Sequence, residues 1–174
     1  MIQLIRFLAI LSLLALVSAC TKPEPTTVAS SPSPSPQRIT SETVVKASAL
    51  PVEITAGGSA EATVHLTIQS GYHVNANPPS FSYLRATTLE VPPTEGVTLG
   101  FVTYPKALKK QFAFAETALA VYEGETDLKA NLKTDKSAKT GQRSIPATLR
   151  IQACDEKLCY PPGELKLTIP INIK

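Results

Sequence analysis

The chain has 174 residues, contains no tryptophan, and carries a formal net charge of only +3 from 17 basic and 14 acidic residues. Its lysines and arginines are scattered rather than gathered in a stripe, so neither composition nor charge indicates nucleic-acid binding. Residues 40–174, which follow the N-terminal segments described next, are numerous enough to form one domain with a hydrophobic core.

Residues 1–19 have the features of a bacterial export signal. Arg6 supplies a positive charge, and the apolar run 7–17 is too short to span a bilayer comfortably. The sequence VSAC, which ends at Cys20, is similar to the lipobox of bacterial lipoproteins. We therefore expect Cys20 to be lipidated and to anchor the protein to the outer or inner membrane. The alternative is an ordinary secretory signal followed by an incidental cysteine.

Residues 20–39 are predicted to form a linker. They are rich in proline, serine and threonine and include the repeat SPSPSP. A segment of this composition buries too little apolar surface to offset the entropy of ordering, which favours an extended, polyproline-like tether. At about 3.1 Å per residue, roughly 17 residues of tether hold a domain up to ~50 Å from a membrane.

Alternation of apolar and polar residues dominates residues 40–174. In the segment 59–69, Ala62, Val64, Leu66 and Ile68 take one face and polar residues the other, as in a half-buried strand. The same pattern predicts further strands at 87–91, 97–104, 118–133, 145–153 and 164–174. Because Pro170 lacks an N–H donor, the last strand is expected at a sheet edge for part of its length.

Turn signals rich in glycine and proline separate these strands, and no segment after the export signal shows a convincing helical stripe. The nearest candidate for a helix is the segment 106–116, whose pattern is too mixed to assign. Many short strands at this spacing predict an all-β fold, an immunoglobulin-like antiparallel β-sandwich. The chain lacks the distant inter-sheet cysteine pair of antibody domains.

Two of the three cysteines, Cys154 and Cys159, are natural partners for a disulfide in an oxidising compartment once Cys20 is lipidated. They flank the tip of a predicted hairpin, where directly opposed residues have Cα atoms about 4.5–5.5 Å apart. If the first arm stays regular, Leu149 and Ile151 face the core and Cys154 falls on the opposite, more accessible face.

This pair has two interpretations. As a purely structural disulfide, a bridge that closes a loop of about six residues contributes only about 2 kcal/mol to the free energy of unfolding in the chain-entropy model. The hairpin already holds its two arms together without it. As a redox centre, it would perform thiol–disulfide exchange, and short-loop or exposed disulfides are often labile. Lys157 favours a thiolate whereas Asp155 and Glu156 oppose it, so these neighbours leave the attacking sulfur open.

The cysteine motif QACDEKLCYPP, together with SGYHVNANPPS at 70–80 and LAVYEGE at 119–125, resembles the N-terminal periplasmic domain of DsbD, the thiol:disulfide interchange protein. The resemblance extends over about residues 44–174. It implies an immunoglobulin-like domain that accepts electrons through Cys154 and Cys159. It also implies thioredoxin-fold partners, namely disulfide isomerases or cytochrome c maturation factors, and no cofactor.

The resemblance further implies a cap loop that shields the cysteine pair with an aromatic side chain. By position, KQFAFAE offers Phe112 or Phe114 for this cap. Tyr160 either stacks over the disulfide or fills the end of the sandwich. His73 either takes part in proton transfer near the disulfide or is a packed, hydrogen-bonded residue.

The sequence departs from the DsbD pattern in two respects. It has one residue fewer between its cysteines than the best-known member, and it ends at Lys174 without the transmembrane carrier and thioredoxin-like domain of full-length DsbD. We therefore expect a stand-alone, lipid-anchored copy facing the periplasm, which needs a separate membrane thiol electron donor. The competing hypothesis is a non-catalytic binding or assembly module of the envelope with a structural disulfide. With two histidines and no methionine after Met1, no metal site is predicted.

Overall fold

The computed structural model describes residues 38–174. The predicted export signal, the lipidation site at Cys20 and the linker up to residue 37 lie outside this part of the chain. The described residues form one short 3₁₀ turn, η1 (Ser41–Thr43), and twelve strands. Among these residues, no helix has the length and apolar character needed to cross a membrane.

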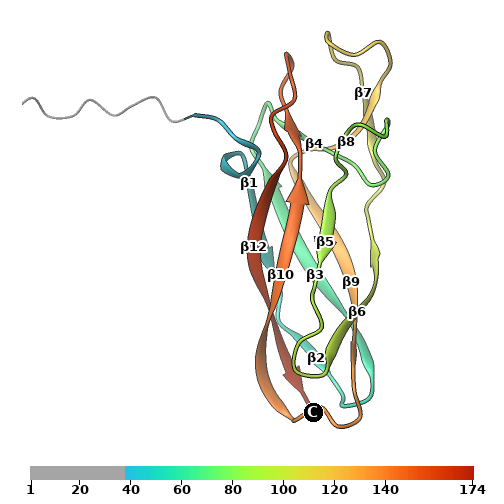
Figure 1. The fold of residues 1–174 in the computed structure, drawn as a ribbon, viewed down its shortest axis with the longest axis vertical. Helices are drawn as coiled ribbons and strands as arrows, with labels where there is room; N and C mark the ends of the chain where they lie inside the picture. Colours follow the sequence, from blue (N-terminus) through green and yellow to red (C-terminus); the bar gives the residue numbers. More distant parts are fainter. Residues whose placement is uncertain (1–37) are drawn as a thin grey trace, which may run out of the picture. The chain divides into compact units, whose positions relative to one another are not determined.

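Two four-stranded sheets form the body of the domain (Figure 1). The first is antiparallel throughout and has the order β1 (Val45–Ala49), β3 (Ser59–Ile68), β9 (Glu125–Thr134), β6 (Val97–Thr103). The second has the order β2 (Val52–Ile54), β12 (Gly163–Ile173), β10 (Gly141–Ile151), β5 (Thr88–Glu90). Its strands are antiparallel except for β2, which pairs with β12 in parallel.

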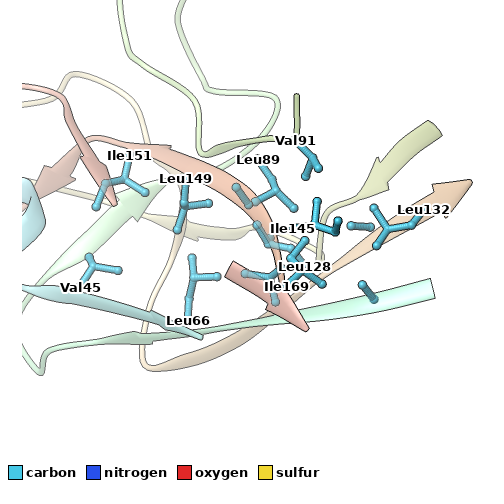
Figure 2. Close-up of a cluster of buried hydrophobic side chains, with 14 of the residues drawn as sticks. Val45, Leu66, Leu89, Val91, Leu128, Leu132, Ile145, Leu149, Ile151 and Ile169 are labelled. Carbon is cyan, nitrogen blue, oxygen red and sulfur yellow. The ribbon is translucent and has the colours of Figure 1, made fainter. Parts of the chain in front are cut away.

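The core lies between the inner faces of these two sheets. Leu66 of β3 and Leu128 of β9 belong to the same buried cluster as Leu149 of β10 and Ile169 of β12, as Figure 2 shows. The outward-facing residues of β3 are polar or partly exposed, as its alternation predicts. The predicted all-β, immunoglobulin-like sandwich is therefore confirmed.

The hairpin of β10 and β12 carries the cysteine motif at its tip. Its eleven residue pairs run without interruption from Gly141↔Ile173 to Ile151↔Gly163. On the other side of β12, strand β2 pairs only with residues 171–173. The stretch of β12 that includes Pro170 therefore has a strand on one side only within the described residues, which confirms the expected edge position.

A third, smaller sheet forms at the same end of the domain as the hairpin tip. Its order is β11 (Ala153–Cys154), β4 (His73–Asn75), β8 (Leu119–Tyr122), β7 (Leu108–Lys110). In Figure 1 the loop that follows β7, in yellow, and the red tip of the β10–β12 hairpin rise at this same end. The sheet brings three distant parts of the chain together around the cysteines: β4, the neighbouring strands β7 and β8, and β11.

One sequence prediction differs from the structure in this region. The segment 118–133 is not one strand but two, because Gly124 adopts a left-handed conformation (φ 61°) between β8 and β9. These strands join different sheets, and all four residues of β8 are buried, so β8 shows no alternation. The segment 106–116, which the sequence pattern left unassigned, contains β7 and a loop.

Candidate functional site

Cys154 and Cys159 form a disulfide with an S–S distance of 2.03 Å. The two residues face each other across an isolated antiparallel bridge, as the hairpin prediction required. Their Cα atoms are 3.8 Å apart, which is closer than the predicted 4.5–5.5 Å. The structure thus confirms that these two cysteines are joined at the tip of the hairpin.

The prediction that Cys154 lies on an accessible face is wrong, because its side chain is 0% exposed. Strand β10 ends at Ile151, and Gln152 interrupts the alternation before β11 begins. β11 then pairs with β4 of the third sheet, so Ala153 and Cys154 are both buried. Cys159 is partly exposed. The two cysteines therefore differ: Cys154 is inside the domain, and Cys159 is a partly exposed residue.

The turn between the cysteines is organised by Asp155. Its Oδ1 accepts hydrogen bonds from the backbone N–H groups of Lys157 (2.7 Å) and Leu158 (2.9 Å), and its Oδ2 accepts one from the hydroxyl of Tyr160 (2.7 Å). The bond from Tyr160 lowers the pKa of Asp155, and the same bond raises the pKa of Tyr160 to about 12. An aspartate that bonds the backbone two and three residues ahead is a common way to stabilise a tight turn.

Tyr160 fastens this turn to the rest of the site. Its backbone N–H donates to the carbonyl of Ala153 (2.8 Å), and its ring lies 6.1 Å from the ring of Tyr72. The residue also packs against the main core. These contacts are those of a packing residue at the end of the sandwich.

Ser41 forms hydrogen bonds with both arms of the cysteine hairpin. It is not among the site residues predicted from the sequence. Its buried hydroxyl accepts a hydrogen bond from the N–H of Ala153 (2.9 Å) and donates one to the carbonyl of Pro161 (2.7 Å). These partners are 112 and 120 residues away in sequence, so no local pattern marks this serine.

The predicted cap corresponds to the loop between β7 and β8. Phe112 is 1% exposed and packs in a small cluster with Leu84, Leu119 and Val121. Its ring stacks at 5.2 Å on the ring of Phe114, which is 42% exposed. Phe112 therefore anchors the loop, and Phe114 is the aromatic residue that the loop presents at the surface.

Cys159 lies in the wall of a cavity beside this loop. The aromatic and aliphatic residues that line it with Cys159 are Phe81, Tyr83, Leu84, Phe114, Leu119 and Leu158. Tyr83 is 74% exposed, and its ring stacks on Phe81 with 5.2 Å between centroids. The partly exposed cysteine thus borders an apolar surface. Phe81 and Tyr83 lie in a loop without a periodic pattern, so no sequence signal marks them as site residues.

His73 stands directly opposite Cys154 in the β4–β11 pair. It is 2% exposed, and Phe112 packs edge-on against its ring at 5.3 Å. Its Nε2 atom lies 2.7 Å from Nζ of Lys110 and 3.0 Å from a carboxylate oxygen of Glu123. Lys110 also forms an ion pair with Glu156 in the cysteine turn (3.0 Å). A charged network thus lies next to the buried cysteine.

No group of three or more histidine, cysteine or acidic side chains within residues 38–174 is arranged to hold a metal ion. His65, the other histidine, lies on β3 and contacts Glu125 and Asp127 of the neighbouring β9. Both carboxylates raise its pKa, with the Asp127 bond the larger cause. This cluster faces the solvent side of the first sheet, on a different sheet from the cysteines.

Comparisons with known proteins identify the family of the chain. The family model of the N-terminal region of the thiol:disulfide interchange protein DsbD matches residues 21–169. Among solved structures, the N-terminal domain of DsbD from Neisseria meningitidis in its reduced form is similar, with 20% identity and a TM-score of 0.49. The alignment covers 75% of this chain and 88% of that one.

The N-terminal periplasmic domain of ScsB from Proteus mirabilis is also similar, with 14% identity and a TM-score of 0.50. Here the alignment covers 72% of this chain and 44% of the ScsB chain. No curated protein matches the sequence closely enough to count as a relative. At 14% identity the ScsB structure bears on the fold alone, whereas the family model extends over most of the chain and includes both cysteines. The chain therefore belongs to the family of DsbD N-terminal domains, and its joined cysteine pair supports thiol–disulfide interchange as its chemistry.

Proposed function

We propose that the protein relays reducing equivalents in the periplasm through the Cys154–Cys159 pair to thioredoxin-fold partners, either disulfide isomerases or cytochrome c maturation factors. One observation supports the proposal: Cys159 is partly exposed and lines a cavity that several apolar residues border, whereas Cys154 is buried. A disulfide that serves only as a staple needs no such asymmetry. A disulfide that exchanges needs one reachable sulfur and one that resolves the intermediate.

The difference in exposure between Cys159 and Cys154 supports different roles for the two residues in the exchange reaction. During reduction, a thiolate of the donor attacks Sγ of Cys159, a new S–S bond forms, and the electron pair of the broken bond passes to Cys154. The second thiolate of the donor then displaces Cys159, and the domain gains two electrons and two protons while the donor becomes a disulfide. During delivery, Cys159 attacks the disulfide of the acceptor, and Cys154 resolves the mixed disulfide.

The surface around Cys159 suits a protein partner. Phe114, Tyr83 and Leu158 are exposed apolar residues, and each lines the cavity next to the cysteine. Exposed apolar residues gathered around a reactive group are typical of a site that a partner covers. Phe114 lines the same cavity as Cys159, which supports a role in shielding the cysteine from small oxidants when no partner is bound.

The proposal includes a membrane anchor at Cys20 and a separate membrane protein that supplies electrons as thiols. The features of the N-terminal sequence support the anchor: a short apolar run followed by small residues and a cysteine. Replacing Cys20 with serine is expected to release the protein from membranes into the soluble periplasmic fraction. An unchanged membrane fraction would contradict the anchor without affecting the role of the other two cysteines.

Trapping in cells tests the relay itself. Cys154→Ser leaves the reachable Cys159 without its resolving partner, so it is expected to accumulate mixed disulfides with thioredoxin-fold proteins. Cys159→Ser is the matched control, because its remaining thiol is buried and is expected to capture much less. If neither variant captures a partner, the relay is refuted, and the rival hypothesis of an envelope binding module with a structural disulfide is favoured.

A further inference from the structure

Two buried polar side-chain atoms, both on β4, have no hydrogen-bond partner within the described part of the chain: Oδ1 of Asn75 and Nδ1 of His73. The one on the residue opposite Cys154 is Nδ1 of His73, which is buried together with the rest of the side chain. A buried polar atom left unpaired costs free energy, and such atoms are rare in folded proteins. Its position on β4, directly opposite Cys154, suggests that a partner becomes available in another state of the site.

We take the nearer neighbour of Nε2 as the group that sets which ring nitrogen carries the proton. The ammonium of Lys110 has only donors, and it lies 2.7 Å from Nε2, so in the neutral ring Nε2 accepts and the proton resides on Nδ1. Glu123 lies 3.0 Å from the same Nε2 and would accept a hydrogen bond from it only if the proton resided there, which the NMR measurement below distinguishes. With Nε2 as the acceptor, the ring presents a buried N–H donor at Nδ1 that has no acceptor within the described residues.

The strand register brings this donor close to Cys154. Opposed residues of an antiparallel pair project to the same face of the sheet, with Cβ atoms about 4.5–5.5 Å apart. His73 and Cys154 are such a pair, and both side chains are buried. In the disulfide form Cys154 carries no charge. When exchange at Cys159 breaks the bond, Cys154 receives an electron pair and becomes an anion in a buried position, where an unpaired charge is costly.

We propose that His73 donates a hydrogen bond from Nδ1 to the sulfur of Cys154 as the disulfide opens, and so stabilises the buried thiolate. The inference rests on the proposed thiol–disulfide exchange and adds to it the group that handles the leaving sulfur. Lys110 acts as a positioning residue, because its bond to Nε2 keeps the proton on Nδ1. The charged groups around this network are Lys110 on β7, Glu123 after β8, and Glu156 in the cysteine turn.

The step is balanced without any further reactant. The attacking thiolate forms a bond to Cys159, the Cys154–Cys159 bond breaks, and its electron pair remains on Cys154. A hydrogen bond from a neutral His73 involves no net proton transfer, and the thiolate later takes a proton from water. In the delivery direction the same bond holds Cys154 as the thiolate that resolves the mixed disulfide.

The first test measures the pKa of the Cys154 thiol in the full chain carrying Cys20→Ser and Cys159→Ser, which leaves Cys154 as its one thiol. His73→Phe removes the donor but keeps an aromatic ring against Phe112. His73→Asn keeps an N–H donor near the position of Nδ1. We expect the thiol pKa to rise by about one unit or more in the Phe variant, as a tenfold or larger loss of thiolate stabilisation requires. The Asn variant is expected to restore most of the difference.

The second test measures the rate at which dithiothreitol reduces the disulfide in chains that retain both Cys154 and Cys159. His73→Phe is expected to slow this reaction about tenfold or more, whereas His65→Phe, which removes a histidine from the other sheet, is expected to leave the rate unchanged. Because dithiothreitol needs no protein partner, this result is independent of the partner-trapping experiment. An unchanged thiol pKa and reduction rate in His73→Phe would overturn the inference even if the relay is correct.

A third measurement requires no variant of His73. Nitrogen NMR of the unaltered chain reports the protonation of each imidazole nitrogen in the oxidised and reduced forms. We expect a proton on Nδ1 in both forms, and a shift of this N–H signal on reduction as it gains its acceptor. A ring protonated only on Nε2, or an Nδ1 signal that does not change on reduction, would overturn the inference.

Discussion

Ser41→Ala removes the hydroxyl that joins the two arms of the cysteine hairpin. The lost bonds are those to the N–H of Ala153 and the carbonyl of Pro161. Pro161 is exposed, so water replaces the serine there, but Ala153 is fully buried and its N–H is left unpaired. An unsatisfied buried donor costs about 1–3 kcal/mol, so we expect the free energy of unfolding to fall by about that amount.

Urea unfolding of the purified, oxidised protein measures this loss. Ser144→Ala is the matched control, because Ser144 is exposed on β10 of the same hairpin and its replacement is expected to change stability by less than about 0.5 kcal/mol. A second effect should accompany the loss of stability. With the arms released, the disulfide is expected to react faster with a small thiol. Equal stability of the two variants would refute the idea that Ser41 fastens the cysteine hairpin.

Three further predictions concern the turn, the cap and the exposed histidine. The pKa of Asp155 is lowered in the folded protein, mainly by the hydrogen bond from Tyr160. The stability that Asp155 contributes is therefore present above its ordinary pKa of 3.8 and is lost as pH falls through its pKa in the folded protein. The loss of folding stability caused by Asp155→Asn should therefore become smaller below about pH 4, and a loss that does not change with pH would contradict this. The pKa of His65 is raised in the folded protein. The stability that His65 contributes is therefore present below its ordinary pKa of 6.5 and is lost as pH rises through its pKa in the folded protein. His65→Gln should thus destabilise the protein more at about pH 5.5 than at about pH 8, and the opposite order would exclude the interpretation. Phe114→Ala should speed oxidation of the reduced cysteines by a small disulfide, whereas Phe101→Ala, exposed on β6, should not; equal rates would argue against shielding by Phe114.

Strands with one buried face could be predicted from sequence because their alternation is a local consequence of burial. β3 and β12 illustrate this, since every second residue faces the core as the pattern requires. Strand β8 could not be predicted separately, because a fully buried strand shows no alternation and only Gly124 marks the change of sheet. The short strands β4 and β7, at three residues each, also lack a readable period.

The chemistry of the candidate site could be predicted from the sequence, but the arrangement of its residues in space could not. The spacing of Cys154 and Cys159 in a hairpin indicated that they pair, and the family resemblance directed attention to Phe112, Phe114, Tyr160 and His73. The burial of Cys154 depends on a single irregular residue, Gln152, which shifts the chain from the second sheet to the third. The contribution of Ser41 arises only from tertiary contacts, which no local pattern encodes.

The midpoint potential of the Cys154–Cys159 pair tests the central claim most directly. The purified protein is equilibrated with redox buffers of known potential, and the fraction of free thiols is determined by alkylation. A relay between periplasmic thiol proteins predicts a value between about −180 and −270 mV, where exchanging disulfides of the thioredoxin type lie. A value below about −300 mV is that of a structural disulfide and would contradict an electron-carrying role.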